Sequence, residues 1–194
     1  MIDEILRATV ALLVIVDPLG NIPIFVSLTE KMDKEVRAKT FKVAISIGFS
    51  LLFLFAVFGL EILALFNISI PSFRIAGGLL LLIIAVEILV RGGWHYKGSK
   101  PETTGAVPMG FPLLVGPGAI TATIVNIHTY GLPITIISII LVSIVTWIVL
   151  RYIDLVYFFL GEVGCEVVAR VMAILIAAIA IQFIVEGFLY YART

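Results

Sequence analysis

The chain has 194 residues, enough for one domain or two small ones. Apolar residues make up 61% of it and charged residues 13%, whereas soluble domains average about 45–50% and about 25%, and its mean hydropathy is +1.19. These values exclude a soluble enzyme, a secreted domain and a disordered linker. The net charge is zero, which gives no reason to expect nucleic acid as a partner. The single cysteine, Cys165, excludes disulfides within the chain.

Six apolar stretches are long enough to cross a bilayer as helices, which takes about 20 residues. Peptide groups in lipid have to pair within the protein, and the chain lacks the alternating segments of a membrane barrel, so helices are expected. The predicted spans are residues 5–27, 41–66, 72–91, 110–128, 132–150 and 168–190. The expected fold class is an all-α integral membrane protein with six transmembrane helices.

The orientation of the spans follows from the positive charges. The first, third and fifth loops, with the adjoining span ends, carry ten of the thirteen Lys and Arg residues: Lys31, Lys34, Arg37, Lys39, Lys42, Arg91, Lys97, Lys100, Arg151 and Arg170. Only Arg7, Arg74 and Arg193 fall on the other side. Because positive loops stay in the cytoplasm, we expect a multi-pass protein of the cytoplasmic membrane with both termini outside the cell or in the periplasm.

The two halves of the chain resemble each other weakly. Arg74 near the start of the third span corresponds to Arg170 in the sixth, 96 residues later, and Asp17-Pro18 in the first span corresponds to Gly116-Pro117 in the fourth, 99 residues later. Because each half has three helices, the second lies upside down, as in the inverted repeats of secondary transporters. Chance likeness between apolar helices is the alternative. The expected parts are repeat 1 at 1–91, a cytoplasmic linker at 92–109 and repeat 2 at 110–194.

Prolines interrupt the first and fourth spans near mid-membrane. Proline has no N–H and clashes with the carbonyl four residues back. We therefore expect Pro18, Pro23 and Pro117 to free three carbonyls, those of Val14, Leu19 and Leu113. Freed carbonyls at this depth need a neighbouring helix, water or a ligand as partner. Simple kinks, which are common in membrane helices, are the alternative to a binding site.

Each interruption also has the residues of a helix start. Asp17 and Gly116 are suited to the N-cap position, and the proline after each suits the first helical position. Asp17 supplies a carboxylate at one start, whereas Gly116 has no side chain and leaves the amides of Gly118 and Ala119 open to an anion. A small zwitterion fits this pair. The predicted substrate site comprises Asp17, Pro18, Leu19, Gly20, Asn21, Val115, Gly116, Pro117, Gly118, Ala119 and Thr121.

The segments Asp17-Pro-Leu-Gly-Asn-Ile-Pro-Ile-Phe25 and Pro112-Leu-Leu-Val-Gly-Pro-Gly-Ala-Ile120 resemble the two signature segments of the MarC family, which includes the SnatA neutral amino acid transporters. The segment Arg74-Ile-Ala-Gly-Gly-Leu-Leu-Leu81 is similar to the third-helix segment of that family. The resemblance covers essentially the whole chain. It implies a six-helix inner-membrane protein and, for SnatA-like members, secondary transport of glycine and alanine.

Two carboxyl groups are candidates for proton coupling. Asp17 lies at the first break, and Glu87 lies inside the third span, where a carboxylate is a functional hypothesis by default. The alternative for Glu87 is an ion pair with Arg91 four residues on. Sodium remains the alternative coupling ion, bound by freed carbonyls.

The expected function is secondary active transport of small neutral amino acids by alternating access, with the bilayer and a coupling ion as partners. Alternatives are an exporter of other small solutes or drugs, a channel, and a membrane scaffold. An enzyme is not expected, since His95 and His128 stand alone and no nucleotide-binding loop is present; no cofactor or metal is expected either.

Overall fold

The computed structural model describes residues 2–29, 32–91 and 105–193, and each regular element in these ranges is a helix. The eight elements, in chain order, are α1 (Ile2–Val16), α2 (Ile22–Thr29), α3 (Lys34–Leu65), α4 (Ile70–Arg91), the π-helix η1 (Gly105–Leu114), α5 (Pro117–Tyr130), α6 (Leu132–Arg151) and α7 (Ile153–Arg193). Inside α7 the chain turns at Gly161, whose φ of 64° is a left-handed conformation that glycine adopts without strain.

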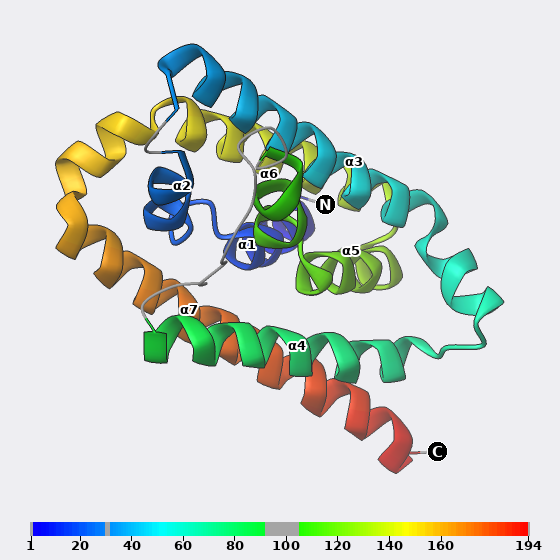
Figure 1. Cartoon of the computed structure of the whole chain (residues 1–194). Coiled ribbons are helices and arrows are strands. Elements are labelled where there is room, and N and C mark those ends of the chain that lie inside the picture. Colours follow the sequence, from blue (N-terminus) through cyan, green and yellow to red (C-terminus); the bar gives the residue numbers. More distant parts are fainter. Residues whose placement is uncertain (1, 30–31, 92–104, 194) are drawn as a thin grey trace.

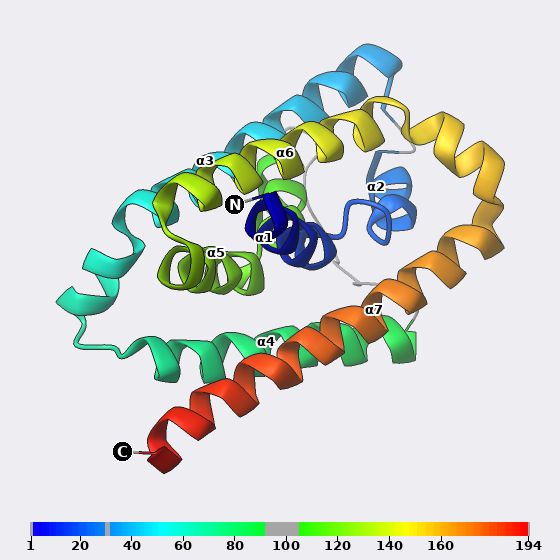
Figure 2. The same ribbon diagram turned by 180° about the vertical axis from the view of Figure 1, so that it is seen from behind.

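The four long helices enclose the four short ones. Helices α3, α4, α6 and α7 are, in the described residues, those long and apolar enough to cross a membrane, α7 from Val163 onward. Helix α3 packs on α6 and α4 packs on α7, and these two pairs lie on opposite sides of α1, α2, η1 and α5 (Figures 1 and 2). The expectation of an all-helical membrane protein with several long apolar helices is therefore met.

The first and fourth predicted spans are each divided into two elements. Residues 17–21 separate α1 from α2, and Val115 and Gly116 separate η1 from α5. Gly116 is extended, with φ −93° and ψ −179°, and Pro117 opens α5 as the sequence predicts. The helix after the first break, however, begins at Ile22 and not at Pro18, because Asp17 has a φ of 44° and the chain makes a turn first.

The predicted linker at 92–109 is too long. Residues 92–104 lie outside the described residues, but Gly105–Met109 form the first half of η1. The linker is predicted from residues such as Gly92, Lys97 and Pro101, and the residues that carry this prediction all lie before Gly105. The sixth predicted span, 168–190, lies within the longer α7.

Glycines let η1 approach α3 closely. A Cβ added to Gly105 would lie 2.7 Å from the carbonyl oxygen of Thr40, and one added to Gly110 would lie 2.8 Å from that of Ala44. The two glycines are five residues apart, the hydrogen-bond spacing of a π-helix, and so face the same neighbour. Small residues at such contacts are how membrane helices pack without a hydrophobic driving force.

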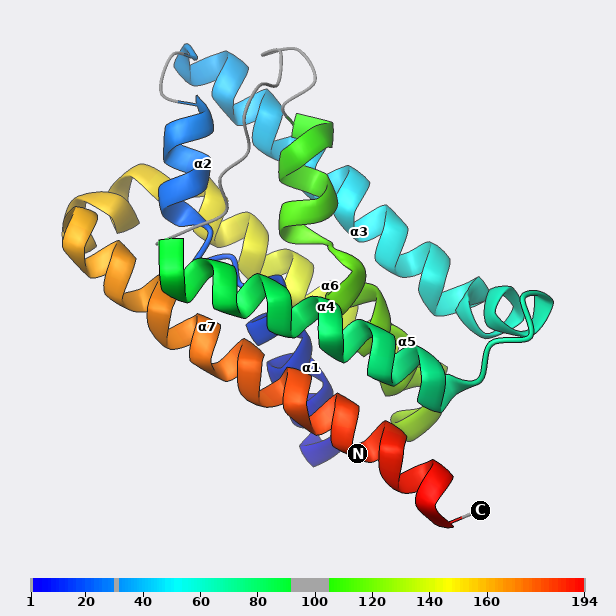
Figure 3. The same ribbon diagram turned by 60° about the horizontal axis from the view of Figure 1, so that its bottom comes forward.

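Polar contacts fix which helix ends share a face of the protein. Arg37 at the start of α3 pairs with Asp154 at the start of α7, with Nη1 and Oδ1 2.6 Å apart. At the other end, the Arg74 Nη1 and Glu186 Oε2 atoms are 2.7 Å apart, which joins the start of α4 to the end of α7 (Figure 3). The first and fifth loops therefore lie at one end of the bundle, as the charge pattern groups them.

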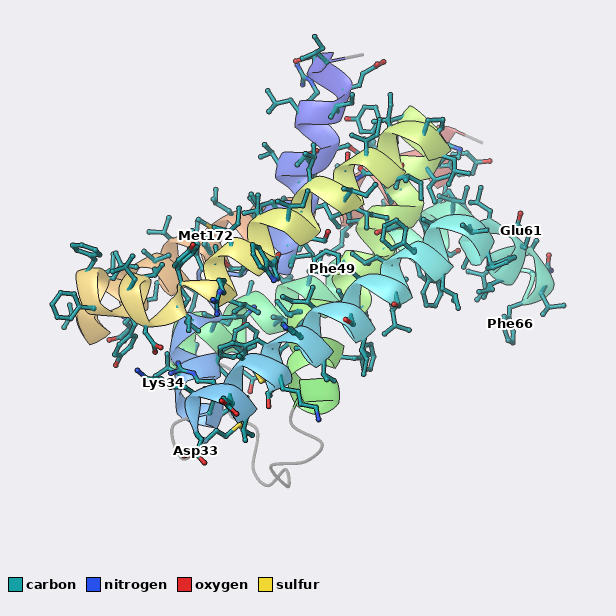
Figure 4. The ribbon with its side chains drawn as sticks, turned by 90° about the horizontal axis from the view of Figure 1, so that it is seen from above. Asp33, Lys34, Phe49, Glu61, Phe66 and Met172 are labelled. Carbon is teal, nitrogen blue, oxygen red and sulfur yellow. The ribbon has the colours of Figure 1, made fainter. Side chains whose placement is uncertain are left out.

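The outer face of the bundle is apolar. Figure 4 shows α3 from Asp33 and Lys34 at one end to Glu61 and Phe66 at the other, with side chains projecting along its length. Leu54, Val57 and Phe58 are among the large apolar residues exposed on it. In a membrane protein this face contacts lipid.

Gly110→Ala should lower the free energy of unfolding by about 1–3 kcal/mol, because the new methyl group meets backbone that cannot move aside. Gly164→Ala is the matched control, since a Cβ there would meet only side-chain atoms of Leu160, the nearest at 3.2 Å. Unfolding midpoints of the two variants in detergent measure the difference. Equal midpoints would show that η1 is not packed on α3 as described.

Candidate functional site

A cavity of about 280 Å³ lies between the two breaks and α4. Ligand pockets start at roughly 300 Å³, so this volume suits a small solute. Its walls are mainly aliphatic, with polar groups gathered at the breaks. The lining residues are Ile15, Asp17, Asn21, Leu80, Leu81, Ile83, Ile84, Ile88, Leu113, Gly116, Pro117, Gly118, Ala119 and Ile176.

Asp17 is buried at the end of α1, with 4% of its surface exposed. Its Oδ1 accepts a hydrogen bond of 2.9 Å from the amide of Gly20, the bond expected of a residue that caps the following turn. Gly20 has to be glycine for this, because a Cβ there would overlap the Asp17 carboxylate. Aspartate is also among the residues that tolerate a positive φ. The turn thus fixes a carboxylate at the cavity wall.

The Asn21 side chain donates to two carbonyls at the end of α1. Its Nδ2 donates to the carbonyl of Asp17 at 3.0 Å and to that of Val16 at 3.3 Å. The amide of Ile22 donates to the carbonyl of Leu19 at 3.2 Å. The prediction that Pro23 frees the Leu19 carbonyl is therefore wrong, because the turn supplies the Ile22 amide as its donor.

The start of α5 forms the opposite wall. Gly116 provides no side-chain cap, as expected. Its carbonyl accepts a hydrogen bond of 3.0 Å from the amide of Ala119, three residues on, which closes the first turn more tightly than an α-helical bond does. The prediction that the Ala119 amide stays open is therefore wrong. Pro117 has no N–H, which makes the Gly118 amide the first of the helix. Gly118 also packs against Leu81 of α4, where a Cβ would overlap the leucine side chain.

The cavity brings together six of the predicted site residues: Asp17, Asn21, Gly116, Pro117, Gly118 and Ala119. The other five predicted residues, namely Pro18, Leu19, Gly20, Val115 and Thr121, are not among its lining residues. Val115 is buried against Gly48 of α3. The Thr121 hydroxyl donates to the Pro117 carbonyl at 2.9 Å, and the side chain meets Gly77 of α4. These two residues therefore pack helices together.

Helix α4 supplies a wall that the sequence does not reveal. Leu80, Leu81, Ile83, Ile84 and Ile88 line the cavity from this helix. Aliphatic residues that face a cavity have the same composition as those that face lipid, so no sequence signal marks them. Glu87 is half-buried on the same helix but is not among the lining residues, and the side chain of Arg91, its predicted partner, lies outside the described residues.

A side chain of α5 holds the two broken spans together. Asn126 Nδ2 donates to the carbonyl of Ala8 in α1 at 3.3 Å, and both residues are buried. This bond positions Asp17 and the start of α5 relative to each other. In the described part of the chain, no three His, Cys, Asp or Glu side chains gather as a metal site requires.

The chain belongs to the MarC family of integral membrane proteins, which matches residues 2–191. It is 38% identical to a UPF0056 membrane protein of Archaeoglobus fulgidus, over 91% of this chain and 88% of the relative. It is 36% identical to one of Methanocaldococcus jannaschii (89% and 90% covered) and 34% identical to the UPF0056 membrane protein YhcE of Escherichia coli (92% and 88% covered). No solved structure matches the chain.

Asp17→Asn should fold about as stably as the wild type, because asparagine keeps an oxygen for the Gly20 amide and tolerates a positive φ. Asp17→Ala leaves that buried amide without its acceptor, which costs about 1–3 kcal/mol, and adds roughly 1–2 kcal/mol of backbone strain. Thermal unfolding of both variants in detergent measures the ranking. A stable alanine variant would mean that the turn does not depend on the Asp17 oxygen.

Proposed function

We propose that this chain is a secondary active transporter of small neutral amino acids, glycine and alanine, which works by alternating access around the cavity between α1 and α5 and is driven by protons. The observation that carries the proposal is that one cavity holds both a buried carboxylate, Asp17, and the bare N-terminus of a helix at Gly118. The names of the relatives state no substrate; the choice of glycine and alanine rests on the family resemblance of the sequence and on the chemistry of the cavity.

The two polar groups suit the two charges of an amino acid. The substrate carboxylate lies at the Gly118 amide, where the helix dipole and the unpaired N–H favour an anion. The ammonium lies at Asp17, whose Oδ1 is already oriented by Gly20. A charged hydrogen bond of this kind contributes about 1.5–3 kcal/mol. A molecule with one charge pairs with only one of these two groups, so simple cations and anions are disfavoured as substrates.

The aliphatic wall of α4 sets the size of the side chain. Leu81 packs on Gly118 itself, and Ile84 and Ile88 line the cavity beside it. A hydrogen or methyl side chain is accommodated beside these residues, whereas a large side chain would have to displace the packed α4 wall and a charged one finds no polar partner there. This favours glycine and alanine over leucine, phenylalanine and lysine.

The alternating-access mechanism rests on two inverted repeats, residues 1–91 and a second repeat that begins at Gly105. Under this pairing α1, α2, α3 and α4 correspond to η1, α5, α6 and α7. The packing supports it, because α1 contacts α6 as η1 contacts α3, and α2 contacts α7 as α5 contacts α4. In such folds one part rocks against the other about a central site. The breaks then lie near mid-membrane, with the first and fifth loops in the cytoplasm and both termini outside.

Protons are the proposed coupling ion, carried by Asp17 and Glu87. Asp17 faces the substrate, so its carboxylate can bind a proton and the substrate ammonium in turn. Glu87 is half-buried on α4, one residue before the cavity residue Ile88. Asp17 lies in the break that follows α1 and Glu87 lies in α4, two parts that the mechanism sets in relative motion.

Labelled glycine should accumulate in proteoliposomes when a proton gradient is imposed, and unlabelled glycine should exchange with it. Asp17→Asn should abolish accumulation although it folds, since the ammonium loses its charged partner. Arg7→Gln, at an exposed residue of α1, is the control and should transport normally. Uptake driven by sodium alone would disprove proton coupling; uptake without counterflow would identify a channel; no uptake at all would leave a scaffold.

Ile84→Ala should let valine and leucine compete with glycine for uptake, because the change widens the cavity by removing three carbons from its wall. Each buried methylene is worth about 0.8 kcal/mol, so competition by leucine should rise by tenfold or more. Val86→Ala on the same helix does not line the cavity and is the matched control. If both variants kept the wild-type preference, α4 would not define the substrate pocket.

A further inference from the structure

A second cavity, of about 520 Å³, lies at the end of the bundle where α3 begins, α6 ends and α7 begins. Figure 4 shows Lys34 at this end of α3. The cavity is strongly basic: Lys34, Arg37, Lys42 and Arg151 line it, and Asp154 is its one carboxylate. No step of the proposed transport uses these residues.

Arg37 is the fixed charge of this basic pocket. Its side chain is only 17% exposed, its Nη1 donates to Asp154 at 2.6 Å, and its guanidinium lies 5.5 Å from the centroid of the Phe41 ring. Its Nε and Nη2 are buried and have no hydrogen-bond partner among the described residues. Buried N–H groups of a charged side chain cost several kcal/mol if they stay unpaired, so the pocket lacks an acceptor.

The position of the pocket indicates where that acceptor comes from. The pocket lies where the apolar run of α3 begins and that of α6 ends, which is the level of the lipid headgroups. Trp147, 48% exposed, lines it, and tryptophan is enriched at this level of membrane proteins. Phe41, Ile45 and Leu150 form an apolar wall next to the charges. Basic pockets between membrane helices bind the phosphates of anionic lipids.

We propose that this basic pocket binds the phosphate group of an anionic phospholipid. Arg37, held by Asp154 and Phe41, supplies a charge that does not turn away into water. Lys34, Lys42 and Arg151 are exposed and close over the phosphate oxygens. Asp154 is 72% exposed, so it orients Arg37 while leaving most of the positive charge of the pocket uncompensated. An acyl chain of the same lipid follows the apolar wall.

Native mass spectrometry of the purified full chain, titrated with phosphatidylglycerol or phosphatidylcholine, tests this site. The wild type should bind phosphatidylglycerol more tightly than phosphatidylcholine. Arg37→Gln should weaken phosphatidylglycerol binding about tenfold, since a charged hydrogen bond is lost, and Lys42→Gln about fivefold. Lys42→Gln leaves the Arg37–Asp154 pair intact and so keeps the test valid if Arg37→Gln fails to fold. Arg7→Gln, with the same charge change elsewhere, should bind like the wild type.

Equal affinity for the two lipids, or equal lipid binding by the Lys42→Gln and Arg7→Gln variants, would overturn the proposal. Inorganic phosphate is the competing source of the same group. If it displaced phosphatidylglycerol from the wild type at equal concentration, the site would belong to phosphate from solution and the lipid assignment would be wrong. Failure of glycine transport has no bearing on these outcomes.

Discussion

A helix can stop inside this protein only where other groups bind the peptide N–H and C=O groups that it releases. At the first break Asp17 accepts from the Gly20 amide, and Asn21 donates to the carbonyls of Val16 and Asp17. At the second break the Gly116 carbonyl takes the amide of Ala119. Because the chain meets these needs itself, it retains a carboxylate and a helix N-terminus in its interior, where polar groups are otherwise too costly. The candidate site is a consequence of how the breaks are stabilised.

Helix α4 connects this interior to the outside of the bundle. It meets α5 through Gly77 and Leu81, and it meets α7 through Gly78, where a Cβ would lie 2.7 Å from the Ala180 carbonyl oxygen. A shift of α4 and α7 as a pair therefore changes the wall of the cavity and leaves the bond from Asn126 to Ala8, which holds the two breaks together, in place. This is the kind of relative motion that the proposed alternating access requires.

The sequence predicts the features that depend on special residues. Proline and glycine mark both breaks, and Gly116-Pro117 predicts the start of α5 to the residue. It does not predict the start of α2, because the positive φ of Asp17 adds a turn that no helix rule anticipates. It also does not predict the α4 wall, because Leu80 or Ile84 would be equally suitable facing lipid. It does not predict the start of η1 at Gly105 either, because glycine and proline, here Gly105 and Pro108, disfavour an α-helix.

The central claim is that Asp17 binds the substrate ammonium while the Gly118 amide binds its carboxylate. Glycine and acetate differ by the amino group, so comparing both ligands on wild type and Asp17→Asn isolates the contact between the ammonium and Asp17. Calorimetry measures the four affinities of this double cycle. The account predicts that the wild type binds glycine at least about tenfold more tightly than acetate, and that this preference falls toward unity in Asp17→Asn. The same preference in both proteins would place the ammonium away from Asp17 and contradict the account.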